Sequence, residues 1–400
     1  MFKDKTVVLG VTGGIAAYKA AELVSRMKKA GAQVICVMTE SAKEFISPLT
    51  LRTLSQNPVY SEMFAEPVRW NVEHIAVADQ ADLFLIAPAT ANILGKVCHG
   101  IADDFLSTTI MATKAPVLFA PAMNVNMYQN PVNQANIQRL TELGYHFVGP
   151  GTGMLACGYE GQGCLADIED ILEAAEYLLV KDKPLLGQKF LITAGPTREA
   201  LDPVRYITNH SSGKMGYAIA AQARLLGAEV TLISGPTNLR AYSGVNVVQV
   251  QSALEMEQAV REHYSEAQVV IKAAAVADYR PQKASSQKIK KQDGELILEL
   301  ERNPDILAGL GSDKGDRVLV GFAAETENVL TNATEKMQRK NLDLIVANDL
   351  TASGAGFNSE TNIVTFIWSD GSCRKLAQMS KTDVARELLG EIIKIKSEKE

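Results

Sequence analysis

Short apolar runs alternate with amphipathic stretches along the whole chain. In the first half, apolar runs predict strands at 6–11, 33–38, 82–87 and 116–120. These runs are rich in Val, Ile and Leu and do not alternate with polar residues, which is typical of strands covered on both faces. Helices are predicted at about 15–29 and 167–179. Strands that alternate with helices in this way indicate a parallel α/β architecture.

The same alternation starts again in the second half of the chain. The predicted strands and helices of this half lie at 189–194, 213–226, 228–233, 252–264, 268–273, 317–322, 326–340 and 343–347. Residues 362–368 and 374–377 predict a β-hairpin around Asp370-Gly371, and a final charged helix begins at about 380. The lysine-rich stretch 278–300 lacks helical periodicity, so we expect either a mobile flap or a hairpin arm there.

A polar, proline-containing stretch at 180–187 separates the two halves. A chain of 400 residues is long for one hydrophobic core, and two domains are the natural expectation. We therefore predict an α/β domain at 1–180, a linker at 181–188 and a second α/β domain at 189–400.

Composition and charge exclude several classes of protein. Hydrophobic residues make up 46% of the chain and charged residues 22%, as in ordinary soluble globular proteins. The net charge of −6 argues against a nucleic-acid partner, and no apolar run approaches the roughly 18 residues that span a bilayer. The N-terminus enters a strand without a signal segment, so we expect a cytoplasmic protein with no membrane partner. The five scattered cysteines include no C-x-x-C pair, which argues against a zinc site.

A glycine-rich turn, Gly10-Val-Thr-Gly-Gly14, follows the first predicted strand, and Thr39 and Ser41 follow the second. Backbone N–H groups and hydroxyls at such strand ends can hold a phosphate, although a merely tight turn is the alternative. The turn is not G-x-G-x-x-G, and no acidic residue closes the second strand. A mononucleotide such as FMN therefore fits this pattern better than NAD.

Three further positions in the first half could carry chemistry. His74 follows the string Trp-Asn-Val-Glu, and Asn124 lies in the turn after the fourth predicted strand. A structural histidine and a turn-forming asparagine are the plainer readings of these two residues. The segment 151–163 is dense in glycine, which indicates a flexible flap that delivers Cys157. A thiol on such a loop can act as an acid or a nucleophile, and a free cysteine with no task is the alternative.

The second half contains its own phosphate-like pattern. The string Asn209-His-Ser-Ser-Gly-Lys214 offers hydroxyls, backbone donors and an amine at a helix start, but it lacks the Walker spacing. Lys288-Ile-Lys-Lys291 gathers three lysines in the predicted flap. Lys336 and Lys340 lie four residues apart on one helix face, so both could reach one polyphosphate.

Together these motifs resemble one family, the bacterial bifunctional phosphopantothenoylcysteine decarboxylase/phosphopantothenate–cysteine ligases of coenzyme A synthesis. The resemblance covers essentially the whole chain. In the first half it rests on the Gly10–Lys19 string, His74-Ile, Ala87-Pro-Ala-Thr, Pro121-Ala-Met-Asn and Ala156-Cys157-Gly. In the second half it rests on Ile192-Thr-Ala-Gly-Pro-Thr, Asn209-His-Ser-Ser-Gly-Lys, Ala274-Ala-Val-Ala-Asp278, Lys288-Ile-Lys-Lys, Asn303-Pro-Asp-Ile and Gly321-Phe-Ala-Ala-Glu.

For the first half, the resemblance implies a flavodoxin-like or Rossmann-like domain that decarboxylates 4′-phosphopantothenoylcysteine with FMN. His74 would be the base of the oxidation step, Asn124 would bind the carboxylate, and Cys157 would donate the proton that completes the reduction. The residues implied to bind FMN are Gly13, Gly14, Ile15, Thr39, Pro88, Ala89, Thr90 and Met127.

For the second half, the resemblance implies a Rossmann-like ligase domain with a β-hairpin or flap. It would join 4′-phosphopantothenate to L-cysteine through an acyl-cytidylate made from CTP, with Mg²⁺ on the triphosphate. Lys288 would contact the transition state, and Asn209 would govern the acyl-cytidylate. The residues implied to bind substrate are Lys272, Ala273, Ala274, Ala275, Asp278, Pro304, Asp305, Ile306, Leu307, Phe322, Lys336 and Lys340. A large homo-oligomer such as a dodecamer is also implied.

The chain departs from the family's pattern at one position in the flap. Cys164 stands where the family usually has Arg or Lys, which removes a cationic contact from the flap. Three other interpretations are weaker. A single-activity protein would not need intact motifs in both halves, and a flavin-bearing regulatory subunit would not need His74, Asn124 and Cys157 together. An NAD-dependent dehydrogenase would need the missing ribose-binding acid.

Overall fold

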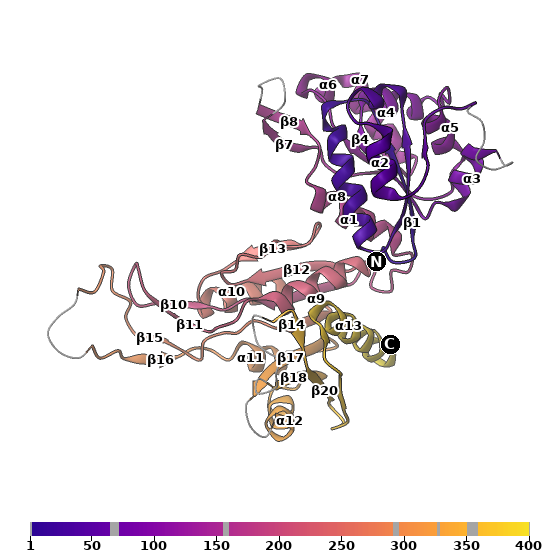
Figure 1. The fold of residues 1–400 in the computed structure, drawn as a ribbon. Helices are drawn as coiled ribbons and strands as arrows, with labels where there is room; N and C mark the ends of the chain where they lie inside the picture. Colours follow the sequence, from indigo (N-terminus) through magenta and orange to yellow (C-terminus); the bar gives the residue numbers. More distant parts are fainter. Residues whose placement is uncertain are drawn as a thin grey trace. The chain divides into compact units, whose positions relative to one another are not determined.

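The computed structural model covers residues 1–400 and describes residues 2–64, 72–154, 160–290, 296–325, 329–349 and 359–399. The chain divides into two compact units, Met1–Lys181 and Asp182–Glu400 (Figure 1). Each unit has its own central sheet with helices on both faces. None of the described helices is long and apolar enough to cross a membrane.

The first unit is built on a six-stranded parallel sheet with the order β3-β2-β1-β4-β5-β6. Its strands are β1 (Thr6–Val11), β2 (Gln33–Met38), β3 (Val59–Tyr60), β4 (Leu83–Ala89), β5 (Val117–Pro121) and β6 (His146–Phe147). The strand order reverses between β1 and β4. The loops that follow these two strands therefore border the crevice where ligands bind in open α/β sheets.

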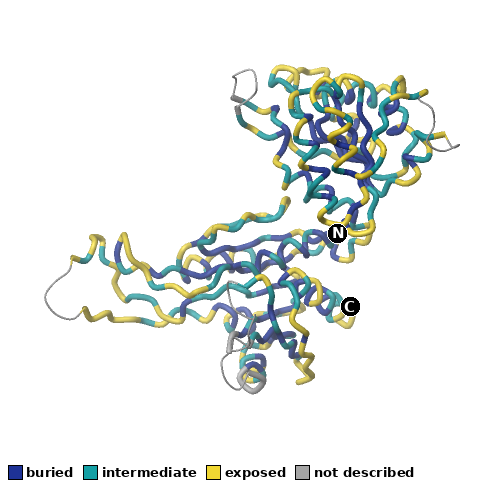
Figure 2. The backbone as a smooth tube through the Cα atoms, in the orientation of Figure 1, coloured by how far each residue is buried: buried dark blue, intermediate teal, exposed yellow. Residues whose placement is uncertain are grey.

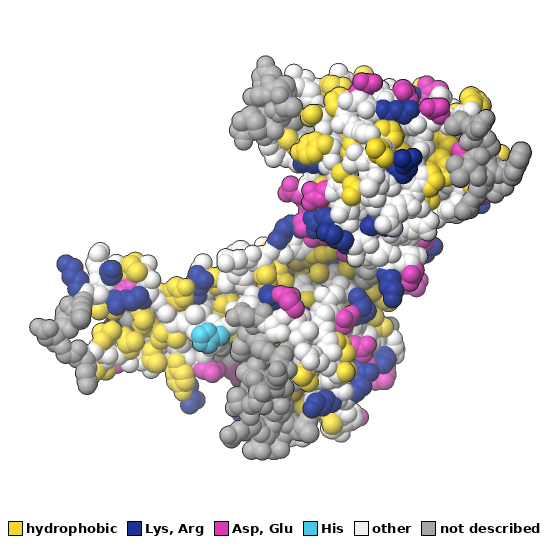
Figure 3. Space-filling view, viewed as in Figure 1, with side chains coloured by type: hydrophobic (Ala, Val, Ile, Leu, Met, Phe, Trp, Pro, Cys, Tyr) yellow, Lys and Arg dark blue, Asp and Glu magenta, His cyan; other side chains and the backbone are white. Residues whose placement is uncertain are grey.

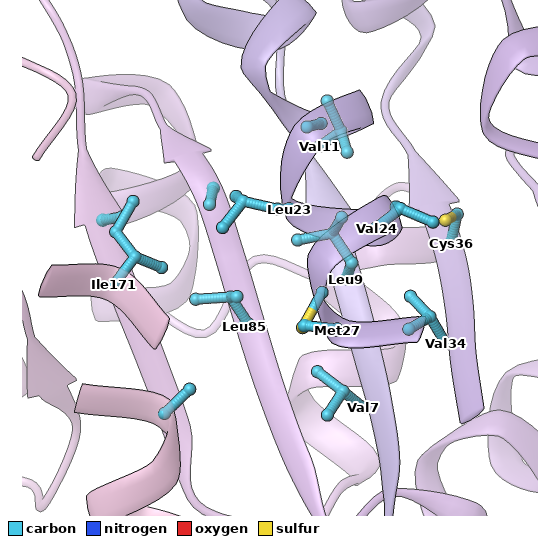
Figure 4. Close-up of a cluster of buried hydrophobic side chains, with 14 of the residues drawn as sticks. Val7, Leu9, Val11, Leu23, Val24, Met27, Val34, Cys36, Leu85 and Ile171 are labelled. Carbon is cyan, nitrogen blue, oxygen red and sulfur yellow. The ribbon is translucent and has the colours of Figure 1, made fainter. Parts of the chain in front are cut away.

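Helices cover both faces of this sheet. They are η1 (Ile15–Lys19), α1 (Ala20–Lys29), η2 (Glu40–Glu44), α2 (Pro48–Ser55), α3 (Glu73–Gln80), α4 (Ala91–Cys98), α5 (Phe105–Ala112), α6 (Val125–Gln129), α7 (Pro131–Glu142) and α8 (Ile168–Leu179). On one face, Leu23 of α1 and Ile171 of α8 pack near Leu9 and Leu85 of the sheet (Figure 4). The helix predicted at 15–29 consists of the 3-10 helix η1 followed directly by α1. A separate antiparallel pair, β7 (Gly151–Met154) and β8 (Glu160–Cys164), lies outside the main sheet.

The second unit is built on an eight-stranded sheet with the order β13-β12-β9-β14-β17-β18-β20-β21. Its strands are β9 (Lys189–Ala194), β12 (Glu229–Ser234), β13 (Asn246–Gln249), β14 (Val269–Lys272), β17 (Val318–Glu325), β18 (Leu344–Asp349), β20 (Val364–Trp368) and β21 (Cys373–Lys375). Six strands are parallel, and the predicted hairpin adds β20 and β21 antiparallel to them. The order reverses between β9 and β14, so this sheet has a crevice of the same kind.

Two helical layers enclose the second sheet. The helices are α9 (Lys214–Leu225), α10 (Ala253–Tyr264), α11 (Ile306–Ser312), α12 (Val329–Arg339) and α13 (Lys381–Lys399). Side chains of α9 and α13 form the core on one face, and those of α10, α11 and α12 form it on the other. Leu185, from the stretch predicted as a linker, is 1% exposed and belongs to the core under α9 and α13.

An arm extends from the second sheet (Figure 1). It consists of two antiparallel pairs, β10 (Arg198–Ala200) with β11 (Tyr206–Thr208), and β15 (Tyr279–Pro281) with β16 (Leu300–Arg302). Residues along the arm are mostly exposed or half-buried, in contrast to the buried sheet strands (Figure 2). The arm contains the lysine-rich stretch at 278–300, which confirms the hairpin-arm alternative for its described residues. A short pair, β19 (Thr361–Asn362) with β22 (Met379–Ser380), precedes α13.

Candidate functional sites

The loops after β1 and β4 are tied together at the crevice of the first sheet. Thr12 is 1% exposed, and its hydroxyl donates to the Pro88 carbonyl over 2.7 Å. The same hydroxyl accepts from the Thr90 N–H over 3.1 Å. Sequence reasoning placed Thr12 inside the glycine turn but gave it no role. The bond shows how the predicted turn and the Pro88–Thr90 segment come to form one surface.

The glycine turn lies against the loop that follows β2. A Cβ atom on Gly13 would lie 2.4 Å from the Cβ of Ser41, so only glycine fits there. A Cβ on Gly14 would meet only a methyl group of Thr90, at 3.9 Å. The Thr39 hydroxyl is buried and has no hydrogen-bond partner in the described structure. A buried hydroxyl without a partner is costly, and a bound oxygen-rich group would satisfy it.

The remaining predicted FMN residues follow strands at the same edge of the sheet but differ in how far they are buried. Ala89 is fully buried at the end of β4, whereas Ile15 and Met127 are 62% and 51% exposed. Ile15 begins η1 directly after the turn, and Met127 lies in α6. The exposed apolar side chain of Ile15, directly after the glycine turn, suits contact with a flat aromatic ring, so these residues fit a flavin mononucleotide.

The Asn124 turn supports the β7–β8 hairpin. Asn124 caps α6, with its Oδ1 accepting from the Asn126 N–H over 2.9 Å. The Met123 N–H donates to the Gly163 carbonyl over 3.0 Å, and a Cβ on Gly163 would lie 2.4 Å from the Met123 carbonyl oxygen. The hairpin is thus held against the turn that presents Asn124. Cys157 lies outside the described residues, and Cys164 is half-buried at the end of β8.

His74 lies on α3, away from the glycine turn in the chain. Its ring meets Phe105 edge-on with 6.4 Å between the ring centroids, and Phe105 stacks on Tyr60 at 5.3 Å. The described structure therefore brings the Asn124 turn and the β7–β8 hairpin together, and it places His74 on α3 against Phe105.

In the second unit, the crevice is a cavity of about 450 Å³. The residues that line it are Thr208, Asn209, His210, Ser211, Ser212, Gly213, Lys214, Met215, Gly216, Ala273, Ala274, Ala275, Phe322, Ala323, Asn348, Asn362 and Lys381. Asn209 reaches across it, because its Nδ2 donates to the Ala275 carbonyl over 3.1 Å. The predicted residues Asn209, Ala273–Ala275 and Phe322 therefore meet in one cavity.

Two lysines from different helices bring positive charge to this cavity. Lys214 opens α9, after Gly213 with a φ of +78°, and it pairs with Glu360. Lys381 opens α13, is 7% exposed, and donates to the Ser359 carbonyl over 2.6 Å. Burial, with the nearby charge of Lys214, lowers the pKa of Lys381. Sequence reasoning missed Lys381 because nothing near it in the sequence distinguishes it from the other charges of the last helix.

A second charged group lies beside the cavity. Lys340 Nζ lies 2.8 Å from an Asp305 oxygen, and Asp305 also caps α11. Burial lowers the pKa of Lys272 to about 8, and the charge of Lys340 contributes to this shift. Asp305 and Asp278 oppose the shift, so Lys340, Asp305 and Asp278 each lie within electrostatic reach of Lys272. Lys336 lies one helical turn before Lys340. Two other predicted substrate residues, Ile306 and Leu307, belong to the hydrophobic core.

Lys288 belongs to the arm. Its side chain is exposed, and it is not among the residues that line the cavity of its own chain. The predicted transition-state lysine is therefore not part of the described cavity that Asn209 and the Ala273–Ala275 segment line.

Fold and sites together define a two-domain α/β protein in which each central sheet reverses its strand order and has a crevice at that point. The Flavoprotein family model matches residues 1–179, and the model of the DNA/pantothenate metabolism flavoprotein C-terminal domain matches residues 185–395. The chain belongs to the family of coenzyme A biosynthesis bifunctional proteins. This confirms the resemblance drawn from the motifs and the two-domain α/β fold class.

Similar proteins cover nearly the whole chain. The coenzyme A biosynthesis bifunctional protein CoaBC of Bacillus subtilis (strain 168) is 51% identical over 395 residues, covering 98% of this chain and 97% of the relative. Its counterpart in Vibrio cholerae is 49% identical over 370 residues, covering 92% of each. A crystal structure of the C-terminal domain of a CoaBC protein is 48% identical with a TM-score of 0.48, covering 54% of this chain and 100% of that one.

Proposed function

We propose that the chain catalyses two consecutive steps of coenzyme A synthesis. Its second unit would ligate 4′-phosphopantothenate to L-cysteine with CTP, through an acyl-cytidylate. Its first unit would then decarboxylate 4′-phosphopantothenoylcysteine to 4′-phosphopantetheine with FMN. The match of a flavoprotein model and a pantothenate-metabolism model to the two units in turn carries this proposal.

In the first unit, bound FMN would oxidise the substrate thiol and return the electron pair after CO₂ has left. The N–H groups of the Gly13–Gly14 turn and the Thr39 hydroxyl would hold its phosphate. The Asn124 amide would donate to the substrate carboxylate while its oxygen stays on the Asn126 N–H. His74 would accept the thiol proton, and Cys157 would return a proton to carbon when reduction is completed.

In the second unit, the cavity would hold the reacting phosphates. Negative charge accumulates there as pyrophosphate leaves, so fixed donors and cations stabilise the transition state. The start of α9 with Ser211 and Ser212 supplies donors, and Lys214 and Lys381 supply charge. The cluster of Lys272, Lys340 and Asp305 would hold the remainder of CTP, and Asn209 would bind the acyl-cytidylate.

Mg²⁺ would enter this site with the nucleotide. The described residues contain no group of three or more His, Cys, Asp or Glu side chains that could cage a metal ion. Mg²⁺ prefers phosphate oxygens, water and one or two carboxylates to a cage made only of protein groups. The triphosphate with a few waters would therefore supply most of its ligands.

The arm supports a homo-oligomer, such as the dodecamer that the resemblance implies. Hydrophobic side chains gather along it (Figure 3). Its exposed apolar residues are Val204, Tyr206, Tyr279, Leu296, Ile297, Leu298 and Leu300. Such a patch marks an interaction surface, and the arm of one subunit would bring Lys288 to the cavity of another.

We also infer a cytoplasmic location, since the scattered cysteines suit a reducing compartment.

An assay of both half-reactions tests the proposal. The purified protein, given 4′-phosphopantothenate, L-cysteine and CTP, should release pyrophosphate and CO₂ and form 4′-phosphopantetheine. Lys288→Gln should suppress pyrophosphate release but still decarboxylate added 4′-phosphopantothenoylcysteine. Cys157→Ser should still release pyrophosphate and CO₂ but stop at the decarboxylated enethiol, without forming 4′-phosphopantetheine. Protein that is colourless and cannot be reconstituted with FMN would contradict the assignment of the first unit.

A further inference from the structure

The exposed arm contains a fully buried carboxylate. Asp202 lies between β10 and β11, and its side chain has 0% of its surface exposed. Its Oδ1 accepts from the backbone N–H groups of Val204 and Arg205, both over 2.8 Å. Its Oδ2 accepts from Arg205 Nε over 2.9 Å and from Nη2 over 2.5 Å. This is a charge-assisted contact of the strong kind.

The same two side chains bind the backbone of the lysine-rich segment. The Ile289 N–H donates to Asp202 Oδ2 over 3.1 Å, and the Ile289 carbonyl accepts from Arg205 Nη2 over 2.6 Å. A further bond, from the Ser285 N–H to the Leu201 carbonyl over 2.9 Å, joins the same two segments. We call Asp202, Arg205 and the Ile289 backbone the arm clasp.

The arm clasp fixes the backbone immediately next to Lys288. Both polar backbone groups of Ile289 are satisfied by one ion pair, so the peptide that follows Lys288 has a defined position. The Lys288 side chain itself is exposed. The arm clasp therefore fixes the backbone from which the Lys288 side chain extends, while the side chain and its ammonium group stay exposed. A catalytic group gains most when its anchor is held in place before the substrate binds.

We propose that Asp202 is a positioning residue of the ligase, which acts by holding Lys288 in place through the arm clasp. The proposal rests on the function proposed above for Lys288. Asp202 does not line the cavity in its own chain. Its effect on the reaction would pass entirely through the lysine-rich segment.

The chemistry of the clasp requires a carboxylate. The guanidinium of Arg205 holds the pKa of Asp202 far below its usual range, so the group stays charged near neutral pH. Asparagine has the same shape, but its NH₂ group is a hydrogen-bond donor and would face the N–H donors that the Asp202 carboxylate now accepts from. The Ile289 N–H or Arg205 would then lose its acceptor, and an unpaired buried group is costly. Asp202→Asn is therefore the informative change, because it alters charge and little else.

The first test measures the segment directly. In the wild-type protein, the Ile289 amide should exchange its hydrogen far more slowly than the amide of an unprotected peptide. In Asp202→Asn, the exchange of Ile289 and tryptic cleavage after Lys288 should both become about tenfold faster. Glu266→Gln is the matched control, because Glu266 pairs with Lys189 over 2.7 Å elsewhere in the second unit. An unprotected Ile289 amide in the wild-type protein would overturn the proposal without any variant.

The second test measures pyrophosphate release in a double-mutant cycle. Asp202→Asn should lower kcat about tenfold with little change in the KM for CTP, and decarboxylation of added substrate should be unchanged. In the Lys288→Gln background, Asp202→Asn should lower kcat hardly any further, because the effect of Asp202 passes through Lys288. Equal losses in both backgrounds would show a general structural effect and would overturn the proposal.

The role of Lys288 and the positioning role of Asp202 can be contradicted separately. If Lys288→Gln leaves pyrophosphate release intact, the role proposed for Lys288 is wrong, and the positioning role of Asp202 is wrong with it. If Lys288→Gln is slow but Asp202→Asn is as fast as wild type, only the positioning role is wrong. Should Asp202→Asn fail to fold, Asp202→Glu keeps the charge. The proposal then requires Asp202→Glu to lose ligase activity in step with the loss of Ile289 protection.

Discussion

At the scale of single residues, the Thr39 hydroxyl is the most direct sign of a ligand site in the first unit. It is buried and has no partner in the described structure, which costs about 1–3 kcal/mol in a folded protein. If FMN satisfies it, Thr39→Val should lower FMN affinity about tenfold. The same change should raise the Tm of the flavin-free protein, by about 2–4 °C for each kcal/mol recovered. Flavin fluorescence and thermal unfolding measure the two effects.

Thr109→Val is the matched control for Thr39→Val. The Thr109 hydroxyl is also buried, but it donates to the Phe105 carbonyl over 2.6 Å within its own helix. Its loss should not raise the Tm of the flavin-free protein, and flavin content should stay at the wild-type level. Equal flavin content in Thr39→Val and in the wild type would show that the hydroxyl does not serve the cofactor.

Lys272 gives the ligase site a dependence on pH. Burial and Lys340 lower its pKa from 10.5 to about 8, and a bound triphosphate would raise it again. Above pH 8, CTP binding should therefore take up a proton, and affinity should fall as pH rises. Calorimetry in buffers of different ionisation enthalpy measures the uptake. Lys272→Met should abolish it, and Lys189→Met, at an exposed ion pair, should not.

The same pKa makes a prediction about folding. Between pH 8 and 10.5, unfolded Lys272 binds a proton that folded Lys272 has released. The free energy of unfolding should therefore rise with pH across this window, and below pH 8 the contribution should be constant. Denaturant titrations at several pH values should show a flatter profile for Lys272→Met. A wild-type profile that falls across the window would contradict the lowered pKa.

Some site residues could be predicted from sequence, and some could not. Asn209 and Phe322 were found because their motifs are long and specific, and the structure places both at one cavity. Lys381 has no motif around it, and only the folding of α13 brings it to Lys214. Likewise, the role of Thr12 depends on Pro88 and Thr90, which are distant in the sequence and adjacent across the sheet.

At the scale of elements, the β7–β8 hairpin depends on its contact with the Asn124 turn. A Cβ on Gly163 would lie 2.4 Å from the Met123 carbonyl oxygen, at a φ of +159° that side chains rarely adopt. Gly163→Ala should therefore displace the hairpin and lower decarboxylation at least about tenfold, while pyrophosphate release stays unchanged. Rates of the two half-reactions, measured on the same preparation, test this.

Gly153→Ala is the matched control on the opposite strand of the hairpin. Its Cβ would lie 3.8 Å from the sulfur of Cys164, an ordinary contact distance. Decarboxylation should therefore remain close to the wild-type rate. A similar loss in both variants would mean that the hairpin tolerates no added side chain, and the contact with Met123 would not be the cause.

Sequence periodicity predicted the long buried elements well. The strands at 33–38 and 189–194 match β2 and β9, because short apolar runs without polar alternation are typical of strands covered on both faces. Of the arm strands, β10 and β11 were missed, since each is three residues long and carries no period, whereas the pair β15 and β16 matches the hairpin-arm alternative for 278–300. Helix 15–29 was only partly right, because the turn at Gly14 starts a 3-10 segment before α1 begins.

At the scale of the whole molecule, each unit has its own sheet and cores. No described strand of one sheet pairs with the other, and no hydrophobic core cluster mixes residues of both units. Calorimetric unfolding should therefore show two transitions. A ligand that binds only one unit stabilises only that unit. FMN should thus shift one transition and CTP with Mg²⁺ the other, whereas a single transition moved by both ligands would contradict independent units.

The separate cores also define what the single peptide link at residues 181–182 provides. Each unit has the interior it needs, so the link is not required for either fold. What it does fix is stoichiometry. Every chain that a ribosome completes supplies one copy of each unit, however strongly the gene is expressed. The capacity to make an intermediate and the capacity to consume it therefore rise and fall together.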